Sequence, residues 1–177
     1  RDIVSGDFYW LTKIENQTII AAADCTGHGV PGAFMSMLGV SYLNEIVNNE
    51  YITHPGVILR RLRKKVIKAL QQKGETGEQR DGMDITLCSI NFDTLTLQFS
   101  GANNPLYIVR NSDKEAVQNA RNTEIENQTL YEIKGDKMPI ALYDRMDKFQ
   151  THEIKLFKDD CLYLFSDGFA DQFGGPN

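Results

Sequence analysis

The chain has 177 residues, of which 41% are hydrophobic and 24% charged, and its formal net charge at pH 7 is −5. This length is enough for one domain with a sizeable hydrophobic core. The acidic balance argues against a dedicated nucleic-acid surface, which usually carries a basic excess. The longest apolar run is far too short to span a bilayer, and no signal peptide is visible. We therefore expect a cytoplasmic domain with no direct membrane insertion of this segment.

Three cysteines, Cys25, Cys88 and Cys161, are widely spaced and odd in number. This pattern favours a reducing compartment over a disulfide framework. No spacing of cysteine and histidine suggests structural zinc. The chain starts at Arg1 without a methionine and ends in a glycine-bearing stretch typical of a loop, so we expect a domain taken from a longer protein.

Two short runs near the N-terminus predict an antiparallel hairpin. Residues 5–10 form the first run, the polar residues 15–18 form the turn, and the continuous apolar residues 19–23 form the second strand. Asp7 begins the first strand and Asp24 ends the second. Because these two positions lie at the same open end of a hairpin, their carboxylates can face one site.

A glycine-rich turn follows Asp24, and Pro31 suits the first turn of a helix. We predict one helix from Pro31 to about Asn49 and a second from Pro55 to about Lys73. The second helix has an apolar inward stripe and a basic outer side. Its cations are Arg60, Arg61, Arg63, Lys64, Lys65 and Lys68. A solvated face and a docking surface for an acidic partner both fit this pattern, whereas the lack of interleaved aromatic residues argues against single-stranded nucleic acid.

The second half of the chain predicts further antiparallel strands. They are expected at residues 83–92 and 94–100 as a hairpin, at 106–110, at 129–133, and at 149–156 and 161–165 as a third hairpin. Residues 111–127 are polar and without periodicity, which is typical of a mobile surface loop. Successive hairpins with two consecutive helices between them predict the α+β class, because a parallel sheet would alternate strand and helix.

The segment Gly27–Gly32 matches the G-x-G-x-x-G fingerprint of dinucleotide-binding proteins. The strand before it belongs to a hairpin, and the helix after it leads into another helix. Since no βαβ unit is formed, we reject the dinucleotide interpretation.

Three aspartates, Asp7, Asp24 and Asp167, each lie where a predicted strand meets a turn. A single such aspartate is usually a turn or cap residue. Together they resemble the ligands of a two-metal hydrolase, in which one carboxylate bridges two cations and others bind each cation. Oxygen ligands of this type suit Mg²⁺ or Mn²⁺.

The motifs that contain these aspartates resemble, in order, those of the SpoIIE-type serine/threonine phosphatases, a bacterial branch of the metal-dependent type 2C superfamily. The matching segments are Ser5–Tyr9, Ala23–Gly29, Gly82–Asp84, Gly101–Leu106 and Phe165–Gly168. The resemblance covers nearly the whole chain. It implies a four-layer α-β-β-α sandwich of two antiparallel sheets flanked by helices, occupying residues 1–177, with a first strand and a closing Asp-bearing strand missing at the two ends.

The resemblance also implies a binuclear site for Mn²⁺ or Mg²⁺. In it Asp24 bridges the two ions, Asp7 and the backbone carbonyl of Cys25 are further ligands, and Asp167 holds the other ion. Asp24 and Asp7 are thus the implied catalytic residues. Thr26 stands where many eukaryotic relatives carry a histidine suited to protonating the leaving group, and we interpret His28 as a turn residue.

The implied activity is hydrolysis of phosphoserine or phosphothreonine on a protein by metal-activated water, without a covalent enzyme intermediate. The implied substrate is a phosphorylated STAS-type anti-sigma-factor antagonist, and the implied context is a signalling protein with an upstream sensor domain. The oligomeric state stays open, a homodimer included. Two alternatives remain: a catalytically silent docking module of the same fold, and a nucleotide-processing domain that uses paired carboxylates.

Overall fold

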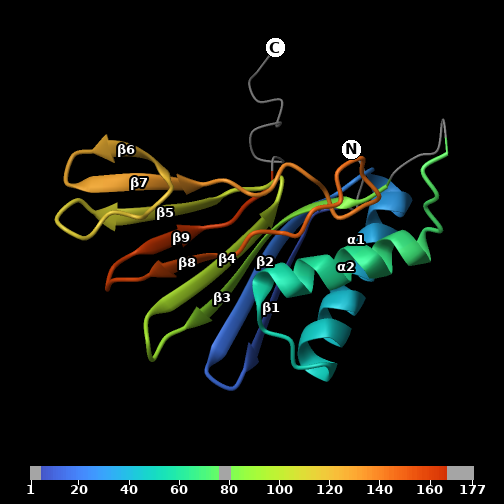
Figure 1. Cartoon of the computed structure of the whole chain (residues 1–177), viewed down its shortest axis with the longest axis horizontal. Helices are drawn as coiled ribbons and strands as arrows, with labels where there is room; N and C mark the ends of the chain where they lie inside the picture. The colour runs from blue at the N-terminus through green and yellow to red at the C-terminus, as the bar shows by residue number, and fades with distance from the viewer. Residues whose placement is uncertain (1–4, 76–80, 167–177) are drawn as a thin grey trace, which may run out of the picture.

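The computed structural model describes residues 5–75 and 81–166, which form two antiparallel sheets and a layer of helices (Figure 1). The five-stranded sheet has the order β1-β2-β3-β4-β8, and the four-stranded sheet has the order β6-β7-β5-β9. The first sheet comprises β1 (Phe8–Ile14), β2 (Gln17–Cys25), β3 (Met83–Asn91), β4 (Thr96–Ala102) and β8 (His152–Lys155). The second comprises β5 (Leu106–Asn111), β6 (Arg121–Ile125), β7 (Gln128–Ile133) and β9 (Cys161–Tyr163).

The predicted first hairpin is confirmed. β1 and β2 pair antiparallel from Phe8 opposite Ala23 to Ile14 opposite Gln17. The connecting residue Glu15 adopts a left-handed φ of 52°. β2 also pairs with β3 along its full length, so this short apolar strand lies inside the sheet, which explains its continuous apolar run.

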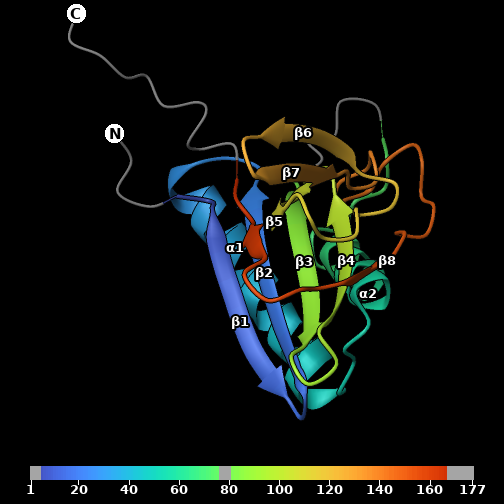
Figure 2. The same cartoon turned by 90° about the vertical axis from the view of Figure 1, so that its left-hand side faces the viewer.

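The helices α1 (Gly29–Leu43), η1 (Asn44–Asn49) and α2 (Pro55–Ala69) cover one face of the five-stranded sheet, behind the strands in Figure 2. The first predicted helix thus begins two residues early and ends in a π-helical turn, η1. The second begins at Pro55 as predicted and ends before Lys73. The apolar side chains between helices and sheet form one core, which includes Trp10, Ile19, Leu43, Ile58, Leu62, Ile85 and Leu87.

A second core separates the two sheets. It includes Cys88, Ile90, Leu97 and Phe99 from the first sheet and Leu106, Ile108, Tyr131 and Ile133 from the second. Side chains alternate along a strand, so β3 contributes Leu87 to the helix side and Cys88 to the inter-sheet side. In the described residues the layer order is therefore helix, sheet, sheet. The predicted α+β class with two packed antiparallel sheets is confirmed, whereas residues 5–75 and 81–166 contain no helix on the outer side of the second sheet, where the predicted four-layer sandwich has its last layer.

Two predictions for the second half were wrong. Residues 149–156 and 161–165 do not form a hairpin, because β8 pairs with β4 in the first sheet and β9 pairs with β5 in the second. The connection between β8 and β9 therefore crosses from one sheet to the other. Residues 111–127 include β6, all of whose residues are exposed at the sheet edge. Its polar sequence gives no alternation by which a strand could be recognised.

None of the helices in residues 5–75 and 81–166 has the length and apolar character of a membrane-spanning segment.

Candidate metal centre

Three aspartates form a row across adjacent strands of the five-stranded sheet. Asp24 in β2 lies directly opposite Asp84 in β3. Phe8 lies opposite Ala23, so the same register continued by one position places Asp7 opposite Asp24. Directly paired residues of antiparallel strands are about 5 Å apart at Cα. We call this row, at the end of the sheet where β1 and β3 begin and β2 ends (Figure 2), the carboxylate edge.

The alternation of side chains shows which face of the sheet the carboxylates occupy. Ala23 belongs to the core between helices and sheet, whereas Ile20 packs against the core between the two sheets. Asp24 shares its face with Ile20 by the period of two, and therefore points to the side of the second sheet. The carboxylates therefore lie on the face of the first sheet that is turned toward the second sheet.

A cavity of about 240 Å³ opens at the carboxylate edge. It is lined by Asp7, Phe8, Tyr9, Ala22, Ala23 and Ser166. Ser166 follows β9 in the second sheet, so the cavity receives residues from both sheets. Tyr9, 85% exposed, stands at its margin.

Cys25 ends β2 and lies beside both predicted carboxylates. The pKa of its thiol is raised to about 12, mainly by burial and in addition by the negative charges of Asp24 and Asp7. Both aspartates lie near enough to this buried thiol to raise its pKa. This agrees with the strand register, which brings Asp7 and Asp24 together.

We expect Cys25 to resist alkylation in the folded protein. At pH 8 a thiol with a pKa of about 12 is ionised to roughly one part in ten thousand, and the thiolate is the reactive form. Cys88 is also buried, whereas Cys161 is exposed. Iodoacetamide followed by mass spectrometry should therefore label Cys161 first, and label Cys25 and Cys88 only after unfolding. Labelling of Cys25 as fast as Cys161 would contradict the buried placement.

The turn after Cys25 is held by close backbone packing. A Cβ at Gly6 would lie 2.8 Å from the Cys25 carbonyl oxygen, and a Cβ at Gly32 would lie 2.6 Å from the Gly27 carbonyl oxygen. Gly27 itself has φ of 89°, a region that favours glycine. The glycines therefore allow the segment before β1, the turn and the first turn of α1 to touch, which fixes the Cys25 carbonyl against Gly6.

Thr26 and His28 complete this turn. Thr26 donates its backbone N–H to the Gly82 carbonyl at 2.9 Å, and its hydroxyl accepts the Gly82 N–H at 3.1 Å. Thr26 thus ties the turn to the start of β3. His28 is the N-cap residue of α1 with extended backbone angles and makes no side-chain cap hydrogen bond, in agreement with its interpretation as a turn residue.

Two residues at this end of the sheet, Asp84 of the carboxylate edge and its neighbour Asn103, were absent from the predicted set of ligands. Asp84 faces Asp24 across the ladder, and Asn103 donates from Nδ2 to Asp84 Oδ1 at 2.8 Å. Asn103 has a left-handed φ of 57° and donates its N–H to the Asp136 carbonyl at 2.8 Å. In the sequence, Asp84 is the first polar residue of a predicted strand. The pairing of that strand with β2, which places Asp84 opposite Asp24, was not predictable.

Gly39 links α1 to the carboxylate edge through Phe8, the residue after Asp7. A Cβ at Gly39 would lie 2.7 Å from Cζ and 2.9 Å from Cε1 of the Phe8 ring. We expect Gly39→Ala to displace this ring and to destabilise the fold by about 1–3 kcal/mol, as overpacking does. Because Phe8 is bonded to Asp7, Mn²⁺ binding should weaken as well.

Thermal unfolding and calorimetric titration with Mn²⁺ test this expectation. Ser41→Ala, at an exposed position of the same helix, is the matched control and should change stability by less than about 0.5 kcal/mol. Alanine is the better helix former by about 1 kcal/mol, so a Gly39→Ala protein that is more stable than the parent would show that Phe8 moves aside freely.

The donor set at the carboxylate edge suits a hard divalent cation, because aspartate carboxylates and a backbone carbonyl are oxygen ligands. In residues 5–75 and 81–166, no three side chains of His, Cys, Asp or Glu come close enough to form a metal cage by themselves. Asp167, the remaining predicted ligand, lies outside the described residues. The residue before it, Ser166, lines the same cavity as Asp7.

Comparison with known proteins gives one family and several similar structures. The family model of "Stage II sporulation protein E (SpoIIE)" matches residues 14–176. The structure of the SiaA PP2C domain of Pseudomonas aeruginosa is 27% identical, with a TM-score of 0.74 over 99% of this chain and 61% of that one. The PP2C phosphatase domain with a fragment of the regulatory domain of SpoIIE from Bacillus subtilis is 15% identical, with a TM-score of 0.65 over 94% of this chain and 42% of that one.

A third structure, of RsbX in complex with magnesium, is 14% identical, with a TM-score of 0.56 over 91% of this chain and 65% of that one. No curated protein matches the chain significantly. The chain spans less than two thirds of the length of each of the three solved structures named above. Since the family model covers nearly all of the sequence and the fold agrees with that of PP2C phosphatase domains, the chain belongs to the SpoIIE family.

Proposed function

We propose that this chain is a metal-dependent phosphatase domain that hydrolyses phosphoserine or phosphothreonine on a protein. The observation that carries the proposal is the carboxylate edge: Asp7, Asp24 and Asp84 lie in one row at the end of the five-stranded sheet, and Asp7 also lines a cavity there. Membership of a phosphatase family supports the reaction type, and the magnesium complex of RsbX supports a divalent cation.

Each residue has a proposed task at this site. Asp24, between Asp7 and Asp84 in the row, would be the ligand common to two ions of Mn²⁺ or Mg²⁺. Asp7 and the Cys25 carbonyl would be further ligands, and Asp167, which follows Ser166, would hold the other ion. When bound, such cations lower the pKa of water and neutralise charge on phosphoryl oxygens.

The remaining residues hold this arrangement. Asn103 donates a hydrogen bond to one oxygen of Asp84, and this bond restricts rotation of the Asp84 carboxylate. Gly6 and Thr26 hold the turn that carries the Cys25 carbonyl. When the oxygen ligands are held in place in this way, a reacting water and a phosphate can be positioned next to each other.

We propose a phosphorylated protein of the STAS-type antagonist class as substrate, and a regulatory sensor domain in the full-length protein as partner. The regulatory domain fragment solved with SpoIIE of Bacillus subtilis supports this context. The alternative is a silent docking module with the same fold.

One assay separates these functions. The full-length protein is incubated with a phosphoserine peptide, and phosphate release is measured with Mn²⁺ and with a chelator in its place. We expect release that depends on Mn²⁺. If the peptide stays intact while the protein binds a phosphoprotein, the chain is a docking module. Hydrolysis or cyclisation of nucleoside triphosphates, with the peptide untouched, would favour the nucleotide-processing alternative.

A further inference from the structure

Five of the six cations of α2 form two groups with different surroundings, whereas Arg63, expected on the outer side of the helix, is buried. Arg61 forms an ion pair with Glu50, and Lys65 forms one with Glu45 at 2.8 Å. These partners belong to η1 and the residue after it, so one side of α2 is neutralised within the domain. Arg60, Lys64 and Lys68, spaced four residues apart on the same polar face, form no ion pair with any residue of the described ranges. We call these three residues the α2 basic stripe.

A further cation lies next to this stripe because the segment 146–151 runs along α2. The buried Arg63 donates from Nη2 to the carbonyl of Asp147 at 2.6 Å, and its guanidinium lies 4.6 Å from the ring centre of Phe149. At the other end of the segment, the Gly56 N–H donates to Thr151 Oγ1 at 3.2 Å. Lys148 lies between these anchor points.

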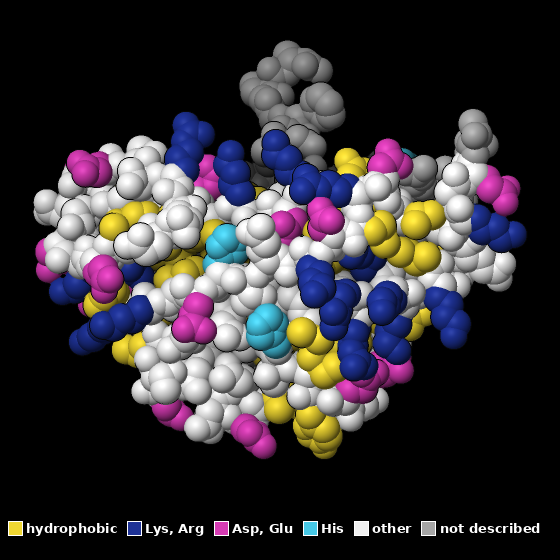
Figure 3. All heavy atoms as spheres, viewed as in Figure 1, with side chains coloured by type: hydrophobic (Ala, Val, Ile, Leu, Met, Phe, Trp, Pro, Cys, Tyr) yellow, Lys and Arg dark blue, Asp and Glu magenta, His cyan; other side chains and the backbone are white. Residues whose placement is uncertain are grey.

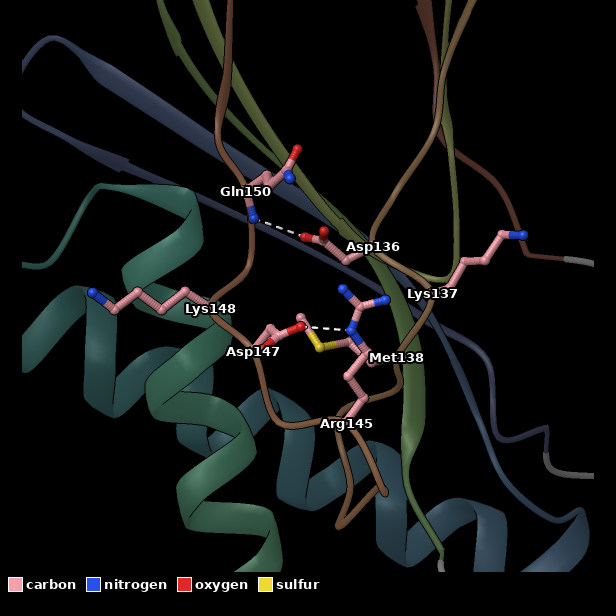
Figure 4. A pocket seen from close by; sticks show the side chains of 7 residues that line it. All are labelled: Asp136, Lys137, Met138, Arg145, Asp147, Lys148 and Gln150. Atoms are coloured by element: carbon pink, nitrogen blue, oxygen red, sulfur yellow. Dashed lines mark hydrogen bonds and ion pairs between the residues drawn. The ribbon is translucent and has the colours of Figure 1, made fainter.

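The figures agree with this placement. In the close view of the cavity beside this segment, lined by Asp136, Lys137, Met138, Arg145, Asp147, Lys148 and Gln150, the Lys148 side chain extends away from the cavity on the side of α2 (Figure 4). On the molecular surface, Lys and Arg side chains gather over α2 (Figure 3). A protein with a net charge of −5 therefore carries a concentrated positive region on one helix.

The C-terminal end of α2 lies toward the end of the sheet that carries the carboxylate edge. From Arg60 to Lys68 the helix rises about 12 Å. Four residues after Lys68, Gln72 donates from Nε2 to the Asp81 carbonyl at 2.6 Å. Gly82, the residue after Asp81, forms hydrogen bonds with Thr26. A negatively charged chain laid along the stripe is thus directed to the end of the sheet that carries Asp24.

The surroundings of the stripe favour an acidic protein surface as its occupant. α2 contains no aromatic residue, so stacked nucleic-acid bases find no platform there. The apolar side of α2 is buried in the core through Ile58, Leu59, Leu62 and Val66, so the large apolar side chains that could anchor the helix in a lipid surface are mostly occupied within the domain. Exposed cations without internal partners complement negative charge and increase the rate of encounter.

We propose that the α2 basic stripe, with Lys148 beside it, docks an acidic surface of the phosphoprotein substrate and so brings the phosphorylated residue to the carboxylate edge. This inference rests on the proposed function. It assigns to α2 a part in substrate selection that is separate from the metal site, because none of these cations belongs to the carboxylate edge.

The test compares binding and turnover of two peptides. Both carry one phosphoserine and a fluorescent label, and one also carries an aspartate tract after a spacer of about six residues, which spans ~20 Å when extended. The variant is Arg60→Gln with Lys64→Gln and Lys68→Gln, which removes charge without adding repulsion. The matched control, Lys13→Gln with Lys114→Gln and Lys158→Gln, removes the same charge at exposed positions on β1 and two loops. Fluorescence anisotropy gives Kd, and phosphate release gives kcat and KM.

We expect the stripe variant to bind the acidic peptide about tenfold more weakly at low salt, with the difference reduced at high salt. Its KM should rise for the acidic peptide alone, while kcat and the hydrolysis of an aryl phosphate stay unchanged. Equal losses in the control variant, equal losses for both peptides, or tighter binding to phosphatidylserine vesicles than to the peptide would each overturn the proposal. If the parent protein binds the acidic peptide through the stripe but releases no phosphate, the docking inference stands and the proposed reaction fails.

Discussion

Replacing Asp24 with Asn is expected to abolish Mn²⁺-dependent hydrolysis of an aryl phosphate while the protein stays folded. Asparagine keeps the shape of the side chain but removes the charge at the centre of the row formed with Asp7 and Asp84. A catalytic metal ion contributes several kcal/mol to transition-state stabilisation. Since 1.36 kcal/mol corresponds to a factor of ten, loss of this ligand should reduce kcat by about a thousandfold.

Asp93→Asn is the matched control for this result. Asp93 is exposed in the turn between β3 and β4, at the end of β3 opposite to Asp84. The same change of charge and shape there should leave kcat within twofold or so of the parent, as is usual for surface changes away from a site. Circular dichroism and thermal unfolding of both variants establish that they are folded. Near-normal turnover by Asp24→Asn would remove the basis of the two-metal proposal.

The placement of Asp7 and Asp24 was predictable because it depends on local sequence. A hairpin with a short polar turn has few registers, and the apolar run of β2 fixes which residues face the core. The open end of the hairpin then follows, and with it the proximity of the two carboxylates. The class α+β was predictable for the same reason, since it requires only the order of strands and helices.

The contribution of Asp84 depended on a contact between strands separated by two helices. The alternation of residues 83–92 indicated a strand, but not that β3 would pair with β2 so as to set Asp84 opposite Asp24. Asn103 was still less accessible, because its bond to Asp84 needs a left-handed backbone and the 135–138 loop as well. Long-range pairing decides such contacts, and no single segment encodes it.

The connection between β8 and β9 shows the same limit. Two alternating runs separated by Lys158, Asp159 and Asp160 have the pattern of a hairpin, yet they belong to different sheets. The structure shows what competes with local pairing: a buried arginine of β5, Arg110, whose partners lie in this connection, in β8 and in the loop after β5. From the sequence, Arg110 was only the last residue of a predicted strand, with nothing to mark it as buried.

Arg110 joins the two sheets at this connection. Its side chain is 2% exposed, and its partner Asp160 is 3% exposed. Arg110 donates to both carboxylate oxygens of Asp160, with Nη2 at 2.7 Å from Oδ2, and to the carbonyls of Glu115 and Lys155 at 2.7 and 2.8 Å. Asp160 Oδ2 also accepts the N–H of Phe157 at 2.9 Å. The guanidinium thereby holds β5, the following loop, the end of β8 and the turn before β9.

Arg110→Leu is expected to lower the free energy of unfolding by about 3–5 kcal/mol, the usual cost of removing one partner from a buried ion pair. The loss arises because the Asp160 carboxylate stays buried without its cation and the carbonyls of Glu115 and Lys155 lose their donor. A domain of this kind has a total stability of about 5–15 kcal/mol, so the variant approaches the limit of folding. Urea unfolding followed by circular dichroism measures the difference.

A double-mutant cycle separates the charge from the packing. Asp160→Asn keeps an oxygen for the Phe157 N–H but removes the negative charge, so Arg110→Leu should cost less in the Asp160→Asn background than in the parent. A coupling free energy of at least about 1 kcal/mol is expected, since the two side chains are in direct contact. Additive losses, or a loss below about 1 kcal/mol for Arg110→Leu alone, would mean that the crossing between the sheets is fixed by apolar packing. In that case Ile154 and Leu156, which enter the core between the sheets, would direct β8 to the first sheet without the ion pair.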